Sequence, residues 1–227
     1  MKTKKRALTL VLIALCTVLV SQTAAADELL VEGQVLGMVG QSQDFVNLSA
    51  GNGTGGMGFL VGYQMDTMPE LRFLASYGVD GMTVNRFNRH MTASWSRHRV
   101  MVGADYGILL FADFVRPLAR VGVGYAGQRL ALSADGVEYA DRAHGFAAQG
   151  QAGVEVDFTA ARTEGPLSVG ANFLVGYLWQ TSASFDAMAP TAERRDDDPW
   201  SRSSYDAGSL SARGVTWNLG VSLRYRL

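Results

Sequence analysis

Lysine, cysteine and charged residues are scarce in this sequence of 227 residues. All three lysines lie within the first five residues, and the single cysteine is Cys16. Charged residues make up 18% of the chain, below the roughly 25% of an average soluble protein. With a net charge of −1, the chain lacks the basic patch of a nucleic-acid binder, so we expect no nucleic-acid partner. A hydrophobic content of 48% also excludes a disordered chain.

The N-terminus has the three parts of a secretory signal peptide. A basic segment, an apolar segment and small residues of a cleavage site follow one another, at residues 2–6, 7–20 and 24–26. We therefore predict a signal peptide over residues 1–26 and one mature domain over residues 27–227. Because Cys16 lies inside the signal peptide, the exported domain has no disulfide framework. Beyond this segment, no apolar run approaches the ~18 residues of a transmembrane helix.

The C-terminal segment alternates strictly between apolar and other side chains. Its apolar positions are Trp217, Leu219, Val221, Leu223, Tyr225 and Leu227. A period of two over this length predicts a β-strand with one apolar and one polar face. The pattern recurs along the chain and predicts eight strands, at residues 30–41, 57–64, 71–78, 99–108, 119–126, 148–158, 168–179 and 216–227.

The connections between these segments alternate in length. Three are short, at residues 66–69, 111–116 and 159–165, and four are longer and more polar, at residues 42–55, 80–97, 133–145 and 186–213. Short turns at one end and long loops at the other are typical of a transmembrane barrel. We therefore predict an all-β fold, an eight-stranded antiparallel up-and-down transmembrane β-barrel with short periplasmic turns and long outer loops.

The distribution of aromatic residues favours this barrel over a soluble β-sandwich, which would also alternate. Aromatic side chains stand at both ends of the apolar faces. Near the short turns these are Tyr63, Tyr106, Phe158 and Tyr225, and near the long loops they are Tyr77, Tyr177, Trp179 and Trp217. Two such girdles mark the two membrane interfaces.

In strand count, loop asymmetry, girdles and final strand, the mature chain resembles the small eight-stranded outer-membrane barrels of the OmpA/OmpX type, without a periplasmic domain. The resemblance implies a location in the cell outer membrane of a Gram-negative bacterium. It also implies that the final strand carries the signal read by the outer-membrane assembly machinery, at Leu219, Val221, Leu223, Tyr225 and Leu227. The family usually ends in an aromatic residue, and this chain departs from that pattern at Leu227.

The polar face of the predicted strands carries charges of both signs. An eight-stranded barrel is only wide enough for its own side chains, and buried charges must pair. We expect a lumen ion-pair network, with three arginines against three carboxylates: Arg72, Arg120 and Arg224 against Asp105, Glu155 and Asp157. Such a network plugs the lumen; the alternative is a narrow, gated path for ions or solutes.

Catalytic, cofactor and metal signals are weak. Gly122, Gly124 and Gly127 match a dinucleotide-binding pattern, but they lie along one strand with no helix behind it, so we expect no cofactor. No cysteine accompanies the histidines, and we expect no metal site. A lipid A acyl hydrolase or transferase is the less favoured alternative, built from His98 with Ser94 or Ser96 and Asp80 or Asp135. The compact His-x-Ser motif of the deacylase family is missing, and we expect no enzyme.

A run of arginines near the second long loop suggests a lipid contact. Arginine binds phosphate in a bidentate manner, so these side chains are candidates for contact with lipopolysaccharide: Arg86, Arg89, Arg97 and Arg99. The expected partners are therefore outer-membrane lipids, lipopolysaccharide and the assembly machinery, with the protein itself a monomer. The predicted function is that of a structural or surface-interaction barrel.

Overall fold

The computed structural model describes most of the predicted mature domain. The described residues are 26–43, 45, 47, 53–65, 67–86, 91–111, 114–134, 137–159, 166–185, 188–190, 204 and 206–227. The predicted signal peptide, apart from its last residue, lies outside these ranges and stays a prediction. Within them, no helix has the length and apolar character needed to cross a membrane.

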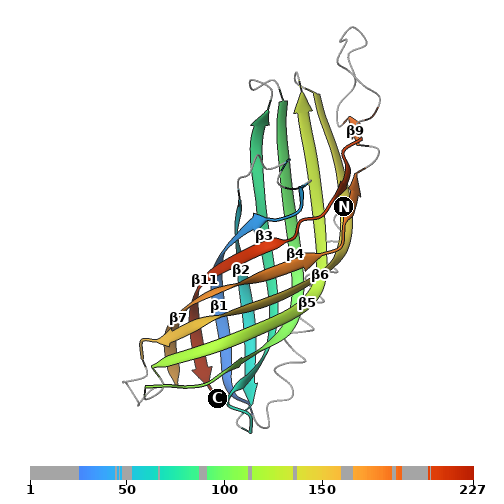
Figure 1. Ribbon diagram of the computed structural model, residues 1–227. Coiled ribbons are helices and arrows are strands. Elements are labelled where there is room, and N and C mark those ends of the chain that lie inside the picture. Colours follow the sequence, from blue (N-terminus) through green and yellow to red (C-terminus); the bar gives the residue numbers. More distant parts are fainter. Residues whose placement is uncertain are drawn as a thin grey trace.

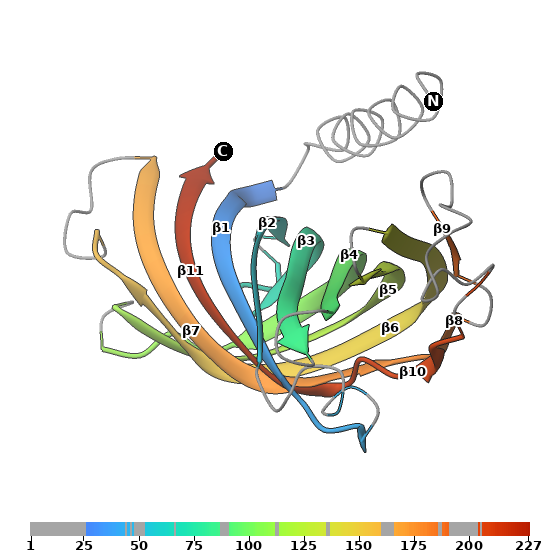
Figure 2. The same ribbon diagram turned by 90° about the horizontal axis from the view of Figure 1, so that it is seen from above.

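Eight long antiparallel strands close into a barrel (Figures 1 and 2). They are β1 (Ala26–Gly40), β2 (Thr54–Met65), β3 (Leu71–Arg86), β4 (Met91–Gly107), β5 (Val115–Ala134), β6 (Val137–Asp157), β7 (Leu167–Gln180) and β11 (Gly214–Arg226). Each pairs with the next along the chain, β7 pairs with β11, and β11 pairs with β1 to close the ring. The predicted eight-stranded antiparallel barrel is confirmed.

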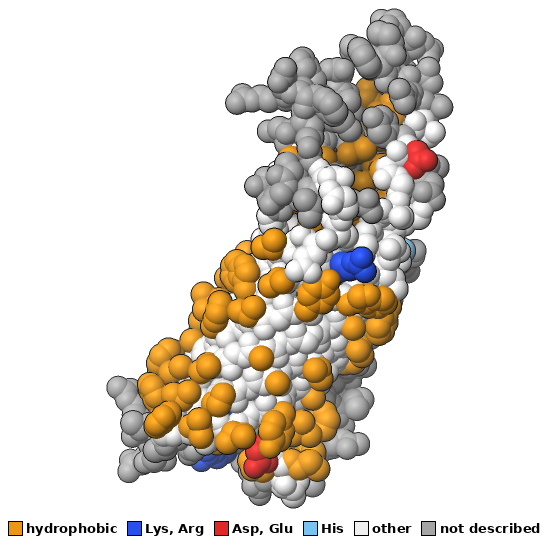
Figure 3. Space-filling model, in the orientation of Figure 1, with side chains coloured by type: hydrophobic (Ala, Val, Ile, Leu, Met, Phe, Trp, Pro, Cys, Tyr) orange, Lys and Arg blue, Asp and Glu red, His pale blue; other side chains and the backbone are white. Residues whose placement is uncertain are grey.

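Over the lower part of the barrel, the end with the short turns, the wall is apolar outside, and its inner face carries charged side chains beside a small apolar cluster of Leu30, Leu60 and Leu74. Outward side chains such as Val121 (62% exposed) and Val221 (60%) face the surroundings, whereas inward Arg72 and Glu155 are buried. Figure 3 shows apolar side chains gathered over this part of the wall. The predicted face of each strand is therefore confirmed.

Above this apolar zone the wall reverses its polarity. Strands β3 and β4 continue to Arg86 and from Met91, and β5 and β6 extend to Ala134 and from Val137, so four strands rise above the rest (Figure 1). Here Trp95 points inward and is buried, while the neighbouring Ser94 and Ser96 point outward. The prediction of long loops at residues 80–97 and 133–145 is wrong for the described residues of both ranges, where β3 to β6 continue and the alternation goes on with the apolar residues now inside.

Inward apolar side chains of these hairpins, together with residues of β1 and β7 and of the segments that follow those two strands, form a cluster that we name the cap. Its members are Met38, Phe45, Ala93, Trp95, Ala126, Leu130, Leu132, Tyr139, Ala147, Leu178, Ala183, Phe185, Met188, Leu210 and Ala212. Trp95 and Phe45 meet edge to face, with ring centroids 5.1 Å apart. Two short paired strands, β8 (Ala183–Phe185) and β10 (Gly208–Leu210), contribute to the cluster, while β9 (Ala189–Pro190) extends the edge of β6. The cap therefore fills the upper end of the barrel.

Aromatic residues stand on the outward face where the sequence predicts two girdles. Tyr106 and Tyr225 are exposed near the short turns, and Trp179 and Trp217 are exposed further up the wall. Trp217 lies opposite Gly37 in the β1–β11 pair, and a Cβ added to Gly37 would come within 2.2 Å of the Trp217 ring. The missing side chain at Gly37 lets the indole lie flat against the wall.

Candidate functional site: the lumen and the outer wall

The lower lumen holds a group of buried charges that we name the lower ion cluster. Its described members are four arginines and five carboxylates: Glu28, Glu32, Arg72, Asp105, Arg116, Arg120, Glu155, Asp157 and Arg224. They stand on the inward faces of β1, β3, β4, β5, β6 and β11. Opposite charges thus meet across the lumen from six strands.

Glu155 is the centre of this cluster. Its Oε2 lies 2.6 Å from Nη1 of Arg72 and 3.5 Å from Nη1 of Arg116. Its Oε1 lies 3.6 Å from Nε of Arg224, whose Nη2 is also 2.5 Å from Oδ2 of Asp157. One carboxylate therefore links three arginines from three strands.

Asp105 forms a second link. Its Oδ1 lies 3.0 Å from Nη1 of Arg116, and its Oδ2 lies 3.4 Å from Nη2 of Arg120. The same Arg120 atom is 3.3 Å from Oε2 of Glu32. Each buried ion loses roughly several kcal/mol of hydration free energy. Shared contacts with opposite charges compensate for this loss and allow the side chains to stay ionised inside the barrel.

All six residues of the predicted network lie in the lower ion cluster, but the pairing is wider than the sequence indicated. Arg116 was assigned to a short turn, although β5 begins at Val115 and places it on the inward face. Glu32 and Glu28 lie on β1; the alternation already indicates an inward Glu32, but neither residue belongs to the predicted network. The period of two on β5, extended by two residues, could have identified Arg116.

A second group of charges, which we name the upper ion cluster, lies beneath the cap. Asp80 and Arg97 are opposite each other on β3 and β4, with Arg97 Nη2 2.5 Å from Oδ2 and Nε 3.0 Å from Oδ1. Arg99 Nε lies 3.5 Å from the same carboxylate. Arg97 also donates to the Gln180 side chain at 3.0 Å, and its guanidinium lies 5.0 Å from the Trp95 ring centroid.

This cluster corrects the expected lipopolysaccharide contact at two of its four arginines. Arg97 is fully buried and Arg99 is 6% exposed, and both face the lumen. They cannot reach lipid phosphates, because β4 continues through the predicted loop and turns its odd-numbered residues inward. The Arg86 side chain and all of Arg89 lie outside the described part of the chain.

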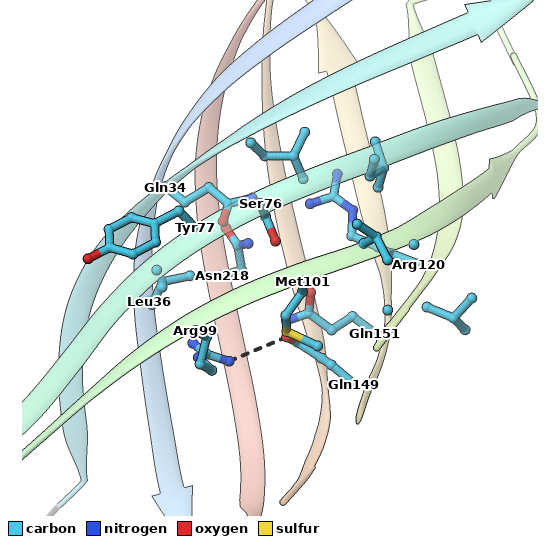
Figure 4. A pocket seen from close by; sticks show the side chains of 17 residues that line it. Gln34, Leu36, Ser76, Tyr77, Arg99, Met101, Arg120, Gln149, Gln151 and Asn218 are labelled. Atoms are coloured by element: carbon cyan, nitrogen blue, oxygen red, sulfur yellow. Dashed lines mark hydrogen bonds between the residues drawn. The ribbon is translucent and has the colours of Figure 1, made fainter. Parts of the chain in front are cut away.

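Between the two ion clusters lies a small chamber of about 50 Å³, which we name the polar chamber after its charged and amide side chains, although Leu36, Leu60, Leu74 and Met101 also line it. Arg99 lines it from one side and Arg120 from the other, with Gln149, Gln151 and Asn218 around it (Figure 4). Arg99 donates to Gln149 Oε1 at 3.4 Å. Asn218 Oδ1 and Arg120 Nε are buried without a hydrogen-bond partner among the described residues. A polar chamber of this size suits a few water molecules rather than a solute.

His98, the histidine of the alternative catalytic hypothesis, and His144 both face outward. His98 Nδ1 lies 2.8 Å from the Tyr77 hydroxyl, and His144 Nδ1 contacts the Tyr125 hydroxyl. Asp80 points into the lumen, on the other side of the wall from His98. His98 and Asp80 therefore cannot form the proposed catalytic pair, and Asp135 lies outside the described residues. The described residues contain no group of three potential metal ligands.

The exterior identifies the kind of protein. A closed barrel pairs its backbone groups from strand to strand, which is a requirement for any β-structure that spans lipid. An exposed apolar zone between two aromatic girdles meets the second requirement, a lipid-facing surface. The protein is an eight-stranded outer-membrane β-barrel, located in the cell outer membrane as the sequence predicts.

No protein-family model matches the sequence, and comparison with curated proteins finds no match. Among solved structures, the chain is similar to Neisserial surface protein A (NspA), with 12% identity, 88% of this chain and 97% of that chain covered, and a TM-score of 0.47. It is similar to Ail of Yersinia pestis in complex with the heparin analogue sucrose octasulfate, at 13% identity, 88% and 99% coverage and a TM-score of 0.45. A third is the N-terminal β-barrel domain of Pseudomonas aeruginosa OprF, at 13% identity, 88% and 99% coverage and a TM-score of 0.39.

Proposed function

We propose that this protein is a structural or surface-interaction barrel whose lumen is plugged and whose work is done on its outer surfaces. The observation that carries the proposal is that three successive groups of side chains fill the lumen. The lower ion cluster, the upper ion cluster and the apolar cap follow one another along the barrel axis. An ion crossing the barrel would have to break paired charges and then pass a dry apolar cluster, where an unpaired charge is strongly disfavoured.

Ion current through the refolded mature protein in a planar bilayer tests this proposal. A gel shift between unboiled and boiled samples first shows that the barrel has folded. We expect no unitary current from folded, inserted protein. Stable unitary steps would overturn the plug and favour the alternative of a narrow ion or solute channel, for which the polar chamber between Arg99 and Arg120 is the supporting feature.

The outer end offers a folded surface beyond the membrane. The β3–β4 and β5–β6 hairpins have buried apolar inner faces, so their outer faces are held in a defined arrangement. Arg86 is the last residue of β3, and its side chain and all of Arg89 lie outside the described residues, so both stay candidates for contact with lipopolysaccharide. The final strand β11 exposes Leu219, Leu223 and Tyr225 to the outside of the barrel, which fits recognition by the assembly machinery.

The separation of His98 from Asp80 by the barrel wall supports a non-enzymatic role. Ser94, Ser96 and His98 stand on the outward face of β4, while Asp80 is held by Arg97 inside. Mass spectra of lipid A from cells that express the wild type and His98→Ala test this role. Identical lipid A in both and in cells lacking the protein supports it, and a modification that disappears with His98→Ala would establish the enzyme instead.

A further inference from the structure

The lipid-facing wall has a groove that none of the functions above uses. It is a shallow depression, widely open to the surroundings, with a volume of about 500 Å³. Side chains of three adjacent strands form most of its lining: Val121 and Val123 of β5, Ala148 and Gly150 of β6, and Tyr177 and Trp179 of β7. The groove lies at the depth of the outer girdle, because Trp179 and Tyr177 belong to it.

Small residues on one strand create the groove. In one row across the sheet, Ala148 lies between Val123 and Trp179; in the next row, Gly150 lies between Val121 and Tyr177. A Cβ added to Gly150 would meet no atom within 4 Å. The two aromatic rings and two valines therefore stand above a floor of small residues, which leaves an apolar channel open to lipid.

Basic side chains follow on the same outward face of β6 toward the outer end. His144 and Arg142 come four and six residues before Ala148, about 14 and 20 Å along an extended strand. Arg129 of β5 is the register partner of Arg142, and it also pairs with Glu138 at 2.8 Å. Arg142 has no ion-pair partner within the described residues and is exposed.

A second histidine widens this basic zone. His98 of β4 and His144 of β6 flank Gly127 of β5 in one row, which separates them by two strand spacings, about 10 Å. Where a tyrosine hydroxyl donates to Nδ1, the ring hydrogen is on Nε2, which can donate to a phosphate oxygen. A single phosphate group is too small to contact both histidines of a zone this wide.

We propose that this wall binds one lipid A moiety of lipopolysaccharide, with an acyl chain in the groove over Ala148 and Gly150. Arg142, His144 and Arg129 bind one phosphate of its headgroup, and His98 lies toward the second. The two phosphates of lipid A match the width of the basic zone, and its acyl chains match the apolar groove below. The proposal rests on the placement of the barrel in the outer membrane.

Native mass spectrometry of the refolded mature barrel, released from nanodiscs, tests the site. The nanodiscs contain phosphatidylcholine alone, or with added lipid A, or with added phosphatidylglycerol. We expect wild type to retain one lipid A, and to retain phosphatidylglycerol at least tenfold less. Equal retention of phosphatidylglycerol would overturn the assignment to lipid A, since a single phosphate would then suffice.

Two variants and two matched controls test the residues. Gly150→Leu fills the groove, and Arg142→Gln removes a cation that has no ion-pair partner among the described residues. Each variant should weaken lipid A retention about tenfold, which corresponds to the loss of one charge-assisted hydrogen bond or its equivalent in contacts. Gly33→Leu is the control for the first, because Gly33 is an outward glycine of β1 with no atom within 4 Å of an added Cβ. Arg213→Gln is the control for the second, because Arg213 is exposed directly before β11.

The outcomes separate this site from the proposed function. Weaker retention by Gly150→Leu and Arg142→Gln, with both controls unchanged, supports the site. Equal retention by all four variants in folded, inserted, non-conducting barrel overturns the site and leaves the plugged-barrel proposal standing. A barrel that conducts ions while it still retains lipid A would overturn the plug and leave the site standing.

Discussion

Asp80 and Arg97 face each other across the β3–β4 pair and share two hydrogen bonds, at 2.5 and 3.0 Å. Both side chains are buried: Arg97 is 0% and Asp80 is 3% exposed. The pair stands between the polar chamber and the cap, where the lumen changes from polar to apolar. It therefore joins the membrane-spanning part of the barrel to its outer end.

Removal of one partner of this pair should destabilise the barrel strongly. Arg97→Gln leaves the Asp80 carboxylate buried with only Thr54 and the more distant Arg99 near it. We expect a loss of about 3–5 kcal/mol in the free energy of unfolding, the range for a broken buried pair. Denaturant unfolding of the refolded barrel measures it. The exposed pair of Arg129 and Glu138 is the control, and Arg129→Gln should lower the free energy of unfolding by at most about 1 kcal/mol. Equal losses in the two variants would show that burial does not make the Asp80–Arg97 pair more important for stability.

The position of Glu155 predicts a difference between two carboxylates of the lower ion cluster. Glu155→Gln removes the charge that links Arg72, Arg116 and Arg224. Asp157→Asn affects one arginine, which still keeps Glu155, and its side chain can still accept from Thr159. We expect Glu155→Gln to lower the unfolding midpoint clearly more than Asp157→Asn. The reverse order would contradict the central role of Glu155.

The cap predicts a local effect at the outer end. Trp95→Ala removes the largest side chain of the cluster and its contact with Phe45, and large aromatic-to-alanine changes in cores cost about 3–5 kcal/mol. We expect proteases to cleave the β5–β6 hairpin of this variant near Arg129 or Arg142 while the gel shift of the lower barrel persists. Ser94→Ala, on the outward face of the same strand, should leave cleavage unchanged.

The packing of Trp217 on Gly37 predicts that the wall does not accept a side chain at that position. Gly37→Val drives the indole away from the wall, and overpacking of this kind typically costs about 1–3 kcal/mol. Gly33→Val on the same outward face meets nothing within 4 Å and should leave the unfolding midpoint nearly unchanged. Comparison of the two midpoints checks the prediction, and two equal values would reject the role of Gly37.

The last residue predicts an effect on assembly rather than on stability. Leu227 is exposed beyond the end of β11, so Leu227→Phe should change the free energy of unfolding by no more than about 0.5 kcal/mol. If the final strand is the assembly signal, the aromatic ending should raise the yield of folded barrel in cells. Heat-modified gel mobility of membrane fractions measures that yield. An unchanged yield, with Tyr225→Ala also unchanged, would contradict the role of this strand.

Strict alternation made most of the barrel predictable. On β7 and β11 the exposed residues are those that the period of two assigned to lipid, and Arg224 is inward as expected. Alternation carries this information because successive side chains of a strand point to opposite faces. The six predicted members of the ion network could be found for the same reason.

The outer hairpins were harder to predict because the rule for their faces is reversed. Ser94, Trp95 and Ser96 alternate as strictly as residues lower on β4, but their polar members face outward into water. Within the membrane, polar residues of a strand face the lumen and apolar residues face the lipid. Prediction by this pattern takes a segment with the opposite arrangement for a loop. Arg97 falls in the predicted loop for this reason, although it belongs to the lumen. Arg99 begins the predicted strand over residues 99–108, and it lies inward with the polar face of that strand rather than at the expected lipid contact.

The amino-acid sequence by itself determined the number of strands, the face of each strand and the membrane-facing surface, because these depend on local periodicity. The tertiary structure decided which charges meet, since Arg72 reaches Glu155 only when β3 and β6 face each other across a closed ring. It also decided that the outer end is a packed cap and that small residues on β6 leave a groove between β5 and β7. Those features depend on the register and curvature of several strands at once, and no single segment of the sequence contains them.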